Sequence, residues 1–251
     1  MVYARAASQL LSDWLILSRR DYYGSNQTRL HYPVHPMVDE RTQMNESSET
    51  KILDITENIE YEKYLYKCLA PMPFRKYWKR HEYLKTAIPR GFHKKLLMLD
   101  SEVVGQIEYA PADASYYPII GEKVIVMNCI WILRKAKGHN LGDQLKIDMM
   151  KSERKAVGFA TVGLEGHWSG WLRKEHMEKL GFKSIDSLEI KHKLKHKGEC
   201  FRIHLMWLPT TEDANPPRWD KTKLLEGVNF CIAHPLYHPE SLESKRIFEK
   251  C

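Results

Sequence analysis

The clearest pattern of apolar and polar positions lies in the middle of the chain. Residues 124–133 are almost all apolar, which is typical of a strand buried on both faces. A segment of small and polar residues follows, and then Leu141, Leu145 and Met149 recur at the spacing of one helix face. The pattern predicts a buried strand, a turn rich in small residues and an amphipathic helix.

The same two periodicities divide the rest of the chain into further strands and helices. The other predicted strands are residues 52–55, 92–99, 103–109, 159–164, 188–194 and 201–208. The other predicted helices are residues 74–88 and 171–180, and Gly181 is suited to be the left-handed cap of the second. This order mixes hairpins with strand–helix units and therefore predicts a mixed α/β fold.

The turn at residues 137–142 has the properties of an anion site. It joins a buried strand to a helix N-terminus, where backbone N–H groups and the positive helix end point at the ligand. The turn does not match the G-x-G-x-x-G dinucleotide fingerprint, and it lacks the Gly-Lys-Ser/Thr ending of a P-loop. We therefore expect a phosphate-containing ligand of another class.

Residues 137–145 resemble the R-G-x-G-x-G-x-x-L loop of the GNAT superfamily, the general control-type N-acetyltransferases. The matching positions are Gly138, Leu141, Gly142 and Leu145. Lys137 stands where the family has Arg or Gln, and Asn140 replaces the middle glycine. Because Asn tolerates a positive φ better than other non-glycine residues, this replacement is compatible with the loop.

A second motif lies further along the chain, after one more predicted strand. Residues 176–182 resemble the Y-E-K-L-G-F segment that ends the fourth helix of the same family. Asn58, Cys68 and the aromatic helix after them look like the N-terminal part of the YoaP-type branch. Many members of that branch have C-x-x-C here, whereas this chain has Cys68-Leu69-Ala70-Pro71, which gives no support for a dithiol function.

The resemblance covers residues 51–208 and implies a mostly antiparallel central sheet flanked by helices and splayed between its fourth and fifth strands. Acetyl-CoA would lie in this splay as the acyl donor, and no metal is implied. Its pantetheine amides would pair with the fourth strand, and its pyrophosphate would bind the amides of the glycine turn. The residues implied to bind it are Ile130, Trp131, Ile132, Lys137, Gly138, His139, Asn140, Leu141, Gly142 and Asp143.

The resemblance also implies direct transfer of the acetyl group to an amine in a ternary complex, for which a base must deprotonate the amine. Glu165 and His167 follow the fifth strand and are candidates, as is Glu108 near the end of the third. Taken alone, Glu108 is better interpreted as a solvated charge at a strand end. The Tyr that serves many members as the acid is replaced by Met177, which cannot donate a proton. His176 is adjacent, but on a helix it should point about 100° away.

A non-catalytic interpretation stays open beside the enzyme. Met177 and Asn140 both depart from the family pattern, and they favour an acetyl-CoA-binding or protein-interaction module with the same fold. The acceptor is also open, because a small-molecule amine, a protein lysine and a protein N-terminus would all suit the chemistry. Turnover would separate the enzyme from the module.

Composition limits the remaining possibilities. The chain has 251 residues with 43% hydrophobic and 11% aromatic residues, which is enough for a sizeable core. Residues 1–50 are expected to be a disordered segment, residues 51–208 the GNAT-like domain, and residues 209–251 an extension that packs on it. No apolar run has the length needed to span a bilayer, so no membrane role is expected.

Charge and cysteine content complete the sequence-based expectations. The net charge of +7 and the basic run 191–197 could suit nucleic acid, but exposed lysines also protect a sheet edge, and we favour the solvated edge. The five cysteines are odd in number, which favours reduced thiols and a cytoplasmic location. Neither the Cys231-His234-His238 spacing nor the pair Cys200 and His204 matches a standard zinc site, so no metal is expected. The oligomeric state is left open.

Overall fold

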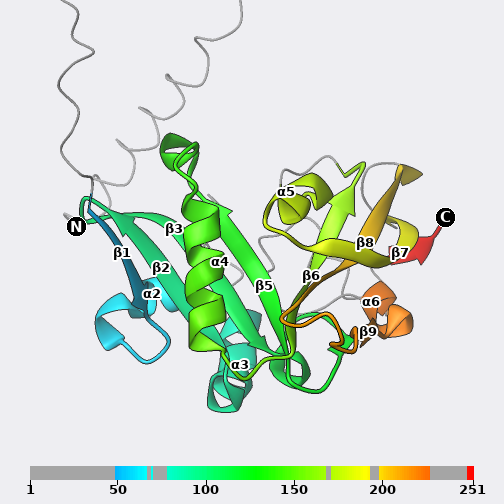
Figure 1. Ribbon diagram of the computed structural model, residues 1–251, viewed down its shortest axis with the longest axis horizontal. Helices are drawn as coiled ribbons and strands as arrows, with labels where there is room; N and C mark the ends of the chain where they lie inside the picture. Colours follow the sequence, from blue (N-terminus) through cyan, green and yellow to red (C-terminus); the bar gives the residue numbers. More distant parts are fainter. Residues whose placement is uncertain (1–48, 67–68, 70–77, 168–170, 193–197, 227–247) are drawn as a thin grey trace, which may run out of the picture. The chain divides into compact units, whose positions relative to one another are not determined.

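The structure, a computed structural model, describes residues 49–66, 69, 78–167, 171–192, 198–226 and 248–251. Within these residues the chain forms an eight-stranded sheet in the order β1-β2-β3-β5-β6-β8-β7-β10 and a small sheet of β4 and β9 (Figure 1). In the large sheet, β5 and β6 are parallel, and the other neighbouring strands are antiparallel. The predicted mixed α/β fold with a mostly antiparallel sheet is therefore confirmed.

The predicted elements follow one another in the predicted order, and the structure adds α2, β4, β9, α6 and β10 to them. The strands of the large sheet are β1 (Thr50–Asp54), β2 (His93–Leu99), β3 (Glu102–Pro111), β5 (Val124–Ile132), β6 (Gly158–Glu165), β7 (Lys183–His192), β8 (Cys200–Pro209) and β10 (Phe248–Lys250). The small sheet contains β4 (Ile119–Ile120) and β9 (Arg218–Trp219). The helices are α2 (Glu62–Leu65), α3 (Trp78–Ala87), α4 (Leu141–Ser152), α5 (Lys174–Lys179) and α6 (Lys221–Glu226). Most of the predicted segment 1–50 and the start of the helix predicted at 74–88 lie outside the described residues.

Adjacent residues of β2 show which helices cover which face of the sheet. The Nζ atom of Lys95 lies 2.6 Å from a carboxylate oxygen of Asp148 on α4. The Nζ atom of Lys94 lies 2.8 Å from a carboxylate oxygen of Glu108 on β3, which also binds Arg80 of α3. Because successive side chains of a strand point to opposite faces, α4 and α3 cover opposite faces, named here the α4 face and the α3 face.

The large sheet opens between β5 and β6. The two strands pair over three residues that end at Val126 and Ala160, and beyond this point they diverge (Figure 1). A register shift between β3 and β5 leaves Asn128 as an extra residue of β5 at the same place, which is a β-bulge. The splay that the resemblance implies is therefore present, and the far half of β5 turns one backbone edge toward the opening.

The hairpin between the strands predicted at 92–99 and 103–109 and the cap predicted at Gly181 are confirmed, and one helix begins later than predicted. Asp100 and Ser101 have φ values of 48° and 66°, which suits a tight hairpin turn between β2 and β3. Gly181 has a φ of 93° and ends α5 as its left-handed cap. However, α5 begins at Lys174, because Leu172 has a φ of 40° and Arg173 forms an isolated bridge with β6.

The part of the chain after β8 contributes strands to both sheets. β9 pairs with β4, and β10 pairs with β7, so that β10 and not β7 is the last strand of the large sheet. The expectation that the basic run 191–197 begins at a solvated edge is therefore wrong for its first residues, and His192 is buried. Residues 193–197 lie outside the described part of the chain.

The expectation of reduced thiols is wrong for two of the five cysteines. Cys200 at the start of β8 forms a disulfide with Cys251, which follows β10, across a sequence separation of 51 residues. Cys129 is buried and does not take part in a disulfide. The cysteine count therefore no longer supports a cytoplasmic location, since lasting disulfides belong mainly to oxidising compartments.

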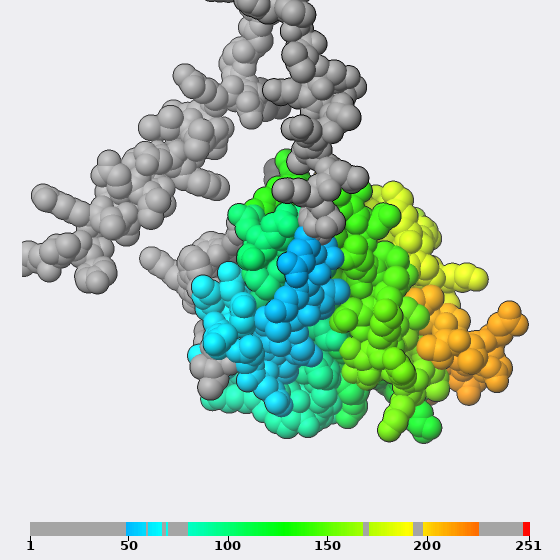
Figure 2. All heavy atoms as spheres, turned by 60° about the vertical axis from the view of Figure 1, so that its left-hand side comes forward, coloured from blue at the N-terminus to red at the C-terminus, as the bar shows by residue number. Residues whose placement is uncertain are grey.

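The surface view shows β1, the first strand in the sheet order, exposed on one side of the molecule (Figure 2). Within the described residues, no helix has both the length and the apolar character that crossing a membrane would require.

Candidate functional site

A cleft of about 1020 Å³ lies where β5 and β6 separate. Its walls come from the end of β5, the turn before α4, the first residues of α4 and the segment containing α5. The residues implied by sequence that line it are Ile130, Trp131, Ile132, Lys137, Gly138, Asn140, Leu141, Gly142 and Asp143. His139 is exposed and does not line the cleft. The glycine turn and the far half of β5 therefore meet in one hollow.

The turn before α4 presents the helix N-terminus to this cleft. Gly138 and Asn140 have φ values of 96° and 52°, so the left-handed conformation expected of Asn140 is confirmed. Asn140 is the N-cap of α4, yet its side chain makes no capping hydrogen bond. The first N–H groups of a helix have no partner within the helix. The turn can thus offer backbone amides and the positive helix end to an anion.

Gly142 leaves space at the first turn of α4. A Cβ atom built at this position would approach only Leu180, at 3.9 Å, which is an ordinary van der Waals distance. The backbone there is helical, so the glycine is not required by its dihedral angles. A bulkier group on the cleft side of Gly142 would therefore compete with a ligand rather than disturb the fold.

The charges around the turn favour an anion. Arg134, Lys137 and Lys179 line the cleft. The carboxylate of Asp143 is 2.6 Å from the Nζ atom of Lys146, which reduces its repulsion of an anion. The same Lys146 donates a hydrogen bond to the backbone carbonyl at the end of α5, 3.0 Å away, and so joins the two sides of the cleft.

The backbone of β5 supplies the opposite wall. β6 pairs with β5 only as far as Val126, so Ile130, Trp131 and Ile132 turn their β6-facing edge to the cleft. Such an edge can bind an extended ligand that carries amide groups, as an added strand would. A strand edge that can pair with peptide-like amides and a turn that can bind an anion, both in one cleft, would suit a ligand that carries both groups.

α5 forms the second side wall, and here the sequence interpretation was incomplete. Met177, which stands where many family members have the Tyr that serves as the acid, is buried and lines the cleft. His176 was expected to point away, yet it also lines the cleft. Partial burial lowers the pKa of His176, which favours its neutral form near pH 7. Successive side chains of a helix are about 100° apart, but both can reach the same hollow from the two flanks of a short helix.

Glu108 is buried in an ion cluster and does not line the cleft. Its two oxygens accept hydrogen bonds from the guanidinium of Arg80, at 2.7 and 3.1 Å, and its Oε1 lies 2.8 Å from Lys94 Nζ. The Tyr116 hydroxyl donates a further hydrogen bond at 3.0 Å. The interpretation of Glu108 as a solvated strand-end charge is therefore wrong, since its side chain is only 3% exposed.

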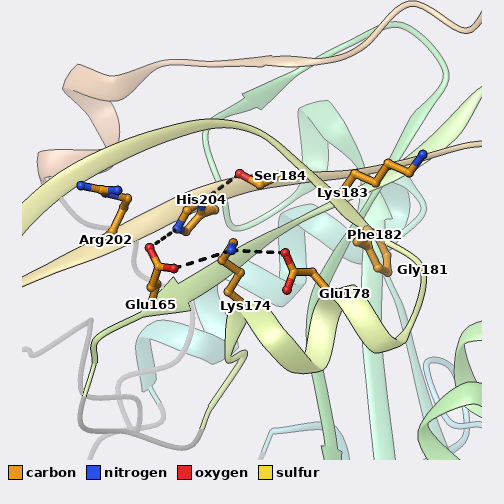
Figure 3. Close-up of a pocket in the computed structure, with 9 residues that line it drawn as sticks. All are labelled: Glu165, Lys174, Glu178, Gly181, Phe182, Lys183, Ser184, Arg202 and His204. Atoms are coloured by element: carbon orange, nitrogen blue, oxygen red, sulfur yellow. Dashed lines mark hydrogen bonds and ion pairs between the residues drawn. The ribbon is translucent and has the colours of Figure 1, made fainter.

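Glu165 lies in a different pocket, on the far side of α5. This second pocket, of about 630 Å³, is also lined by Lys174, His204 and Ser184 (Figure 3). One Glu165 oxygen is 3.2 Å from His204 Nε2, the other is 3.6 Å from Lys174 Nζ, and His204 Nδ1 is 2.8 Å from the Ser184 hydroxyl. The hydrogen bond with His204 lowers the pKa of Glu165, so its carboxylate is ionised near pH 7. A cleft reaction would thus lack direct access to Glu165.

His167 lies on the other face of the sheet from Glu165. The centroid of its ring lies 4.6 Å from that of the Phe201 ring. Phe201 lies on the same face of β8 as Ile203, and Ile203 is in register with Leu164 of β6. Leu164 shares its face with Ala160, and Ala160 is in register with Val126. Val126 is in register with Ala110 of β3, which lies on the same face of β3 as Glu108. This face is therefore the α3 face. The structure therefore separates the three candidate bases: Glu108 and His167 share a face, and Glu165 does not.

Within the described residues no group of three or more His, Cys, Asp or Glu side chains is arranged to hold a metal ion. Cys200, one of the zinc ligands considered, is held in the disulfide, and Cys231, His234 and His238 lie outside the described part of the chain.

Comparison with known proteins finds similarity to solved structures. No family model matches the sequence, and no curated protein matches it significantly. A protein from Desulfovibrio desulfuricans assigned to the GNAT acetyltransferases is 12% identical, with a TM-score of 0.48 over 65% of this chain and 100% of its own. A Bacillus subtilis acetyltransferase in complex with CoA is 11% identical, with a TM-score of 0.44 over 65% and 100%. A GNAT-family acetyltransferase from Brucella melitensis with acetyl-CoA is 14% identical, with a TM-score of 0.41 over 69% and 94%.

Proposed function

We propose that this protein is an acyl-CoA-dependent N-acyltransferase that moves an acetyl group from acetyl-CoA to an amine. The observation that carries the proposal is the cleft at the β5–β6 splay. It combines an open strand edge, suited to the amides of pantetheine, with a helix N-terminus and three cations, suited to a pyrophosphate. Both requirements are met within one hollow of about 1020 Å³.

In this proposal different residues bind different parts of acetyl-CoA. Ile130, Trp131 and Ile132 would pair with the pantetheine arm through their backbone. The pyrophosphate would bind amides of the turn between Gly138 and Gly142, with the side chain of His139 outside the contact, because the N–H groups of Lys137 and Asp143 already donate to the carbonyls of Arg134 and Asn140. The thioester would then lie near the bulge of β5, where strand N–H groups can stabilise the negative charge that develops on its carbonyl oxygen.

The acceptor amine would approach from the α3 face, and His167 is the base that we favour. An amine must lose a proton to attack, and a histidine or carboxylate can take it, directly or through water. Glu165 lies on the far side of α5, and the carboxylate of Glu108 is already engaged by Arg80, Lys94 and Tyr116. His167 follows β6 on the α3 face, where its ring packs on Phe201, and since it does not line the cleft it would act through water.

The second candidate function is a non-catalytic acetyl-CoA-binding module. Its support is Met177, which lines the cleft at the position where a proton donor for the leaving thiolate would be expected. This candidate predicts binding of acetyl-CoA without turnover. The acyl-transfer proposal predicts both, because a thiolate can leave without a dedicated acid if water supplies the proton.

Two measurements on the full chain test the proposal. Calorimetric titration with CoA should give saturable one-site binding, and mass spectrometry should detect acetylated products when acetyl-CoA is offered with a panel of small amines and lysine peptides. Absence of CoA binding would remove the proposal altogether. Binding without any acetylated product above the uncatalysed background would favour the module.

A variant series tests the choice of base. His167→Gln should lower the rate by about 10²–10⁴-fold with unchanged CoA affinity. Glu165→Gln should leave the rate within about twofold, since its side chain faces another pocket. The reverse result, with Glu165→Gln inactive and His167→Gln active, would assign the base to the α4 face and overturn our choice.

A further inference from the structure

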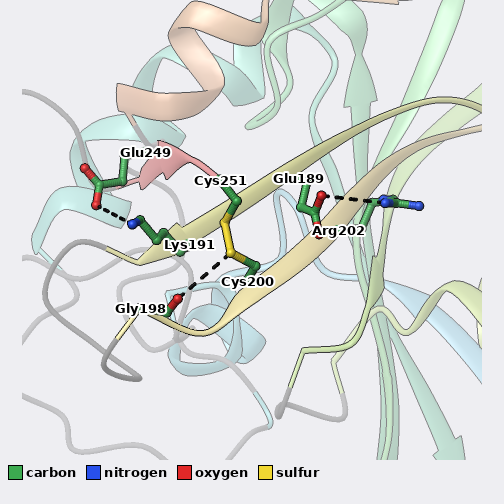
Figure 4. The surroundings of a disulfide bond; sticks show 7 residues. All are labelled: Glu189, Lys191, Gly198, Cys200, Arg202, Glu249 and Cys251. Carbon is green, nitrogen blue, oxygen red and sulfur yellow. Dashed lines mark hydrogen bonds and ion pairs between the residues drawn. A yellow bond between two sulfur atoms is a disulfide. The ribbon is translucent and has the colours of Figure 1, made fainter.

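The last strand of the large sheet is short and is held by few backbone contacts. β10 contributes three residues, which pair with Ile190, Lys191 and His192 of β7. The N–H of Cys251 donates to the Glu189 carbonyl at 3.3 Å, and the Lys191 Nζ atom lies 3.4 Å from a carboxylate oxygen of Glu249 (Figure 4). Partly exposed ion pairs of this kind contribute little stability, so the backbone and ion-pair contacts alone hold β10 weakly.

Despite its shortness, β10 places a fully buried aromatic side chain. Phe248 is 0% exposed, and its ring centroid lies 4.8 Å from that of His192 and 6.1 Å from that of Phe201. Phe201 in turn lies 4.6 Å from His167, and the His167 and His192 rings are 6.0 Å apart. These four rings form one buried cluster, named here the aromatic cluster, at the end of the sheet that carries His167.

A covalent bond fixes β10 to the neighbouring hairpin. The Cys200–Cys251 disulfide joins the start of β8 to the residue that follows β10, and both cysteines are exposed (Figure 4). The Cys200 sulfur lies 3.9 Å from the Gly198 carbonyl oxygen, but a disulfide sulfur has no proton to donate, so this contact is not a hydrogen bond. Solvent can therefore reach the two sulfurs, whereas the aromatic cluster beneath them is closed.

We infer that Cys200 and Cys251 form a redox site whose disulfide state keeps Phe248 in the aromatic cluster and thereby holds His167 in position. Phe248 acts as a positioning residue, through Phe201 and His192, and does not touch the substrates. Reduction releases β10, loosens the cluster and slows acyl transfer. The effect on rate rests on the proposed function, whereas the effect on β10 and the aromatic cluster does not.

The chemistry is an ordinary thiol–disulfide exchange with a small external thiol as the reductant. The external thiolate attacks one exposed sulfur, forms a mixed disulfide and releases the other cysteine as a thiolate, which takes up a proton. A second external thiol resolves the mixed disulfide. Two protein thiols and one external disulfide result, so that two electrons pass from the external thiols to the protein.

The experiment compares the oxidised protein, the protein reduced with dithiothreitol and the Cys200→Ser/Cys251→Ser variant with and without dithiothreitol. Intact mass after alkylation counts the free thiols in each sample. Hydrogen exchange is followed in the peptides that contain β7, β10 and His167. CoA affinity and kcat are measured in parallel. The variant with dithiothreitol is the matched control for effects on the other cysteines.

We expect reduction to add two alkylatable thiols, to speed exchange in β10, β7 and the His167 segment, and to lower kcat by about tenfold, as small misplacements of a catalytic group do. CoA affinity should not change, because the cleft lining contains none of the cluster residues. The double serine variant should match the reduced protein and ignore dithiothreitol.

Two results would overturn the inference. One is that Cys200 and Cys251 alkylate fully without reductant. The other is that exchange in β10 and the His167 segment is the same before and after reduction. If no sample transfers acetyl groups, the exchange result still decides whether the disulfide holds the aromatic cluster, and only the proposed function fails.

Discussion

Gly142→Asp is the sharpest test of the proposed anion site. The change places a carboxylate at the first turn of α4, where the Cβ position has only Leu180 within reach, at 3.9 Å. The fold should therefore accept the side chain, whereas a bound pyrophosphate should not. Asp143 is already present beside it, but Lys146 pairs with that carboxylate at 2.6 Å, so the new charge would be the uncompensated one.

The expected loss follows from Coulomb's law at this half-buried position. Two unit charges about 4 Å apart repel by about 1 kcal/mol in water and by about 4 kcal/mol at the effective dielectric typical of pairs near a protein surface. The exposed turn favours the lower part of this range, and the added volume acts in the same direction. We therefore expect at least a tenfold loss of CoA affinity, which is about 1.4 kcal/mol.

Calorimetric titration with CoA should compare the parent with Gly142→Asp, Gly142→Asn and Gly142→Ala. The asparagine variant has the same shape without the charge, and the alanine variant adds only the Cβ atom. The difference between the aspartate and asparagine variants should shrink in high salt, because exposed charges are screened. If the aspartate variant binds CoA as the asparagine variant does, with the fold intact by circular dichroism, no phosphate lies at this turn and the reasoning is refuted.

Three further outcomes are expected. Glu108→Gln should lower the free energy of unfolding by about 3–5 kcal/mol in chemical denaturation, because it removes the negative charge that pairs with two buried cations. A loss below about 1 kcal/mol would show that the cluster is dispensable. His93→Gln should lower the free energy of unfolding by about 0.5 kcal/mol, since both side chains of the His93–Asp54 pair are more than a third exposed. Its hydrogen bond with Asp54 raises the pKa of His93, so this stabilisation is present below the ordinary pKa near 6.5 and disappears as the pH rises through the raised value; a cost that is equal at pH 6 and pH 9 would contradict it. Residues 44–251 should unfold within a few degrees of the full chain and bind CoA equally, because the sequence before them is polar and proline-containing; a clear drop in either would mean that the removed segment takes part in the fold.

Local patterns were enough to predict the elements that position the cleft. The apolar run of β5 and the helical spacing of α4 each depend on residues that are close in sequence. The positive φ of Asn140 could be predicted because the turn needs it and asparagine tolerates it. The splay came from the family resemblance and not from the pattern, since nothing in the residues of β5 shows where β6 leaves it.

Contacts between distant segments escaped the sequence interpretation. The burial of Glu108 depends on Arg80 and Lys94, which precede it by 28 and 14 residues and reach it from another helix and another strand. β10 has three residues, too few for a period to be recognised, and cysteine counts alone cannot assign a pairing such as Cys200 with Cys251. These are also the contacts on which the proposed redox site depends.

The assignment of the base turns on a single step of strand alternation. Glu165 is the last residue of β6 and points to the α4 face, together with Gly163, where a Cβ atom would lie 3.2 Å from the backbone of α5. Gly166 then takes a φ of 72°, which ends the alternation and lets His167 lie against Phe201 on the opposite face. Two neighbouring candidates that the sequence could not separate are therefore directed to opposite sides of the sheet. Since an amine that approaches from the α3 face can meet only one of them, Gly166 determines which side chain is available as the base.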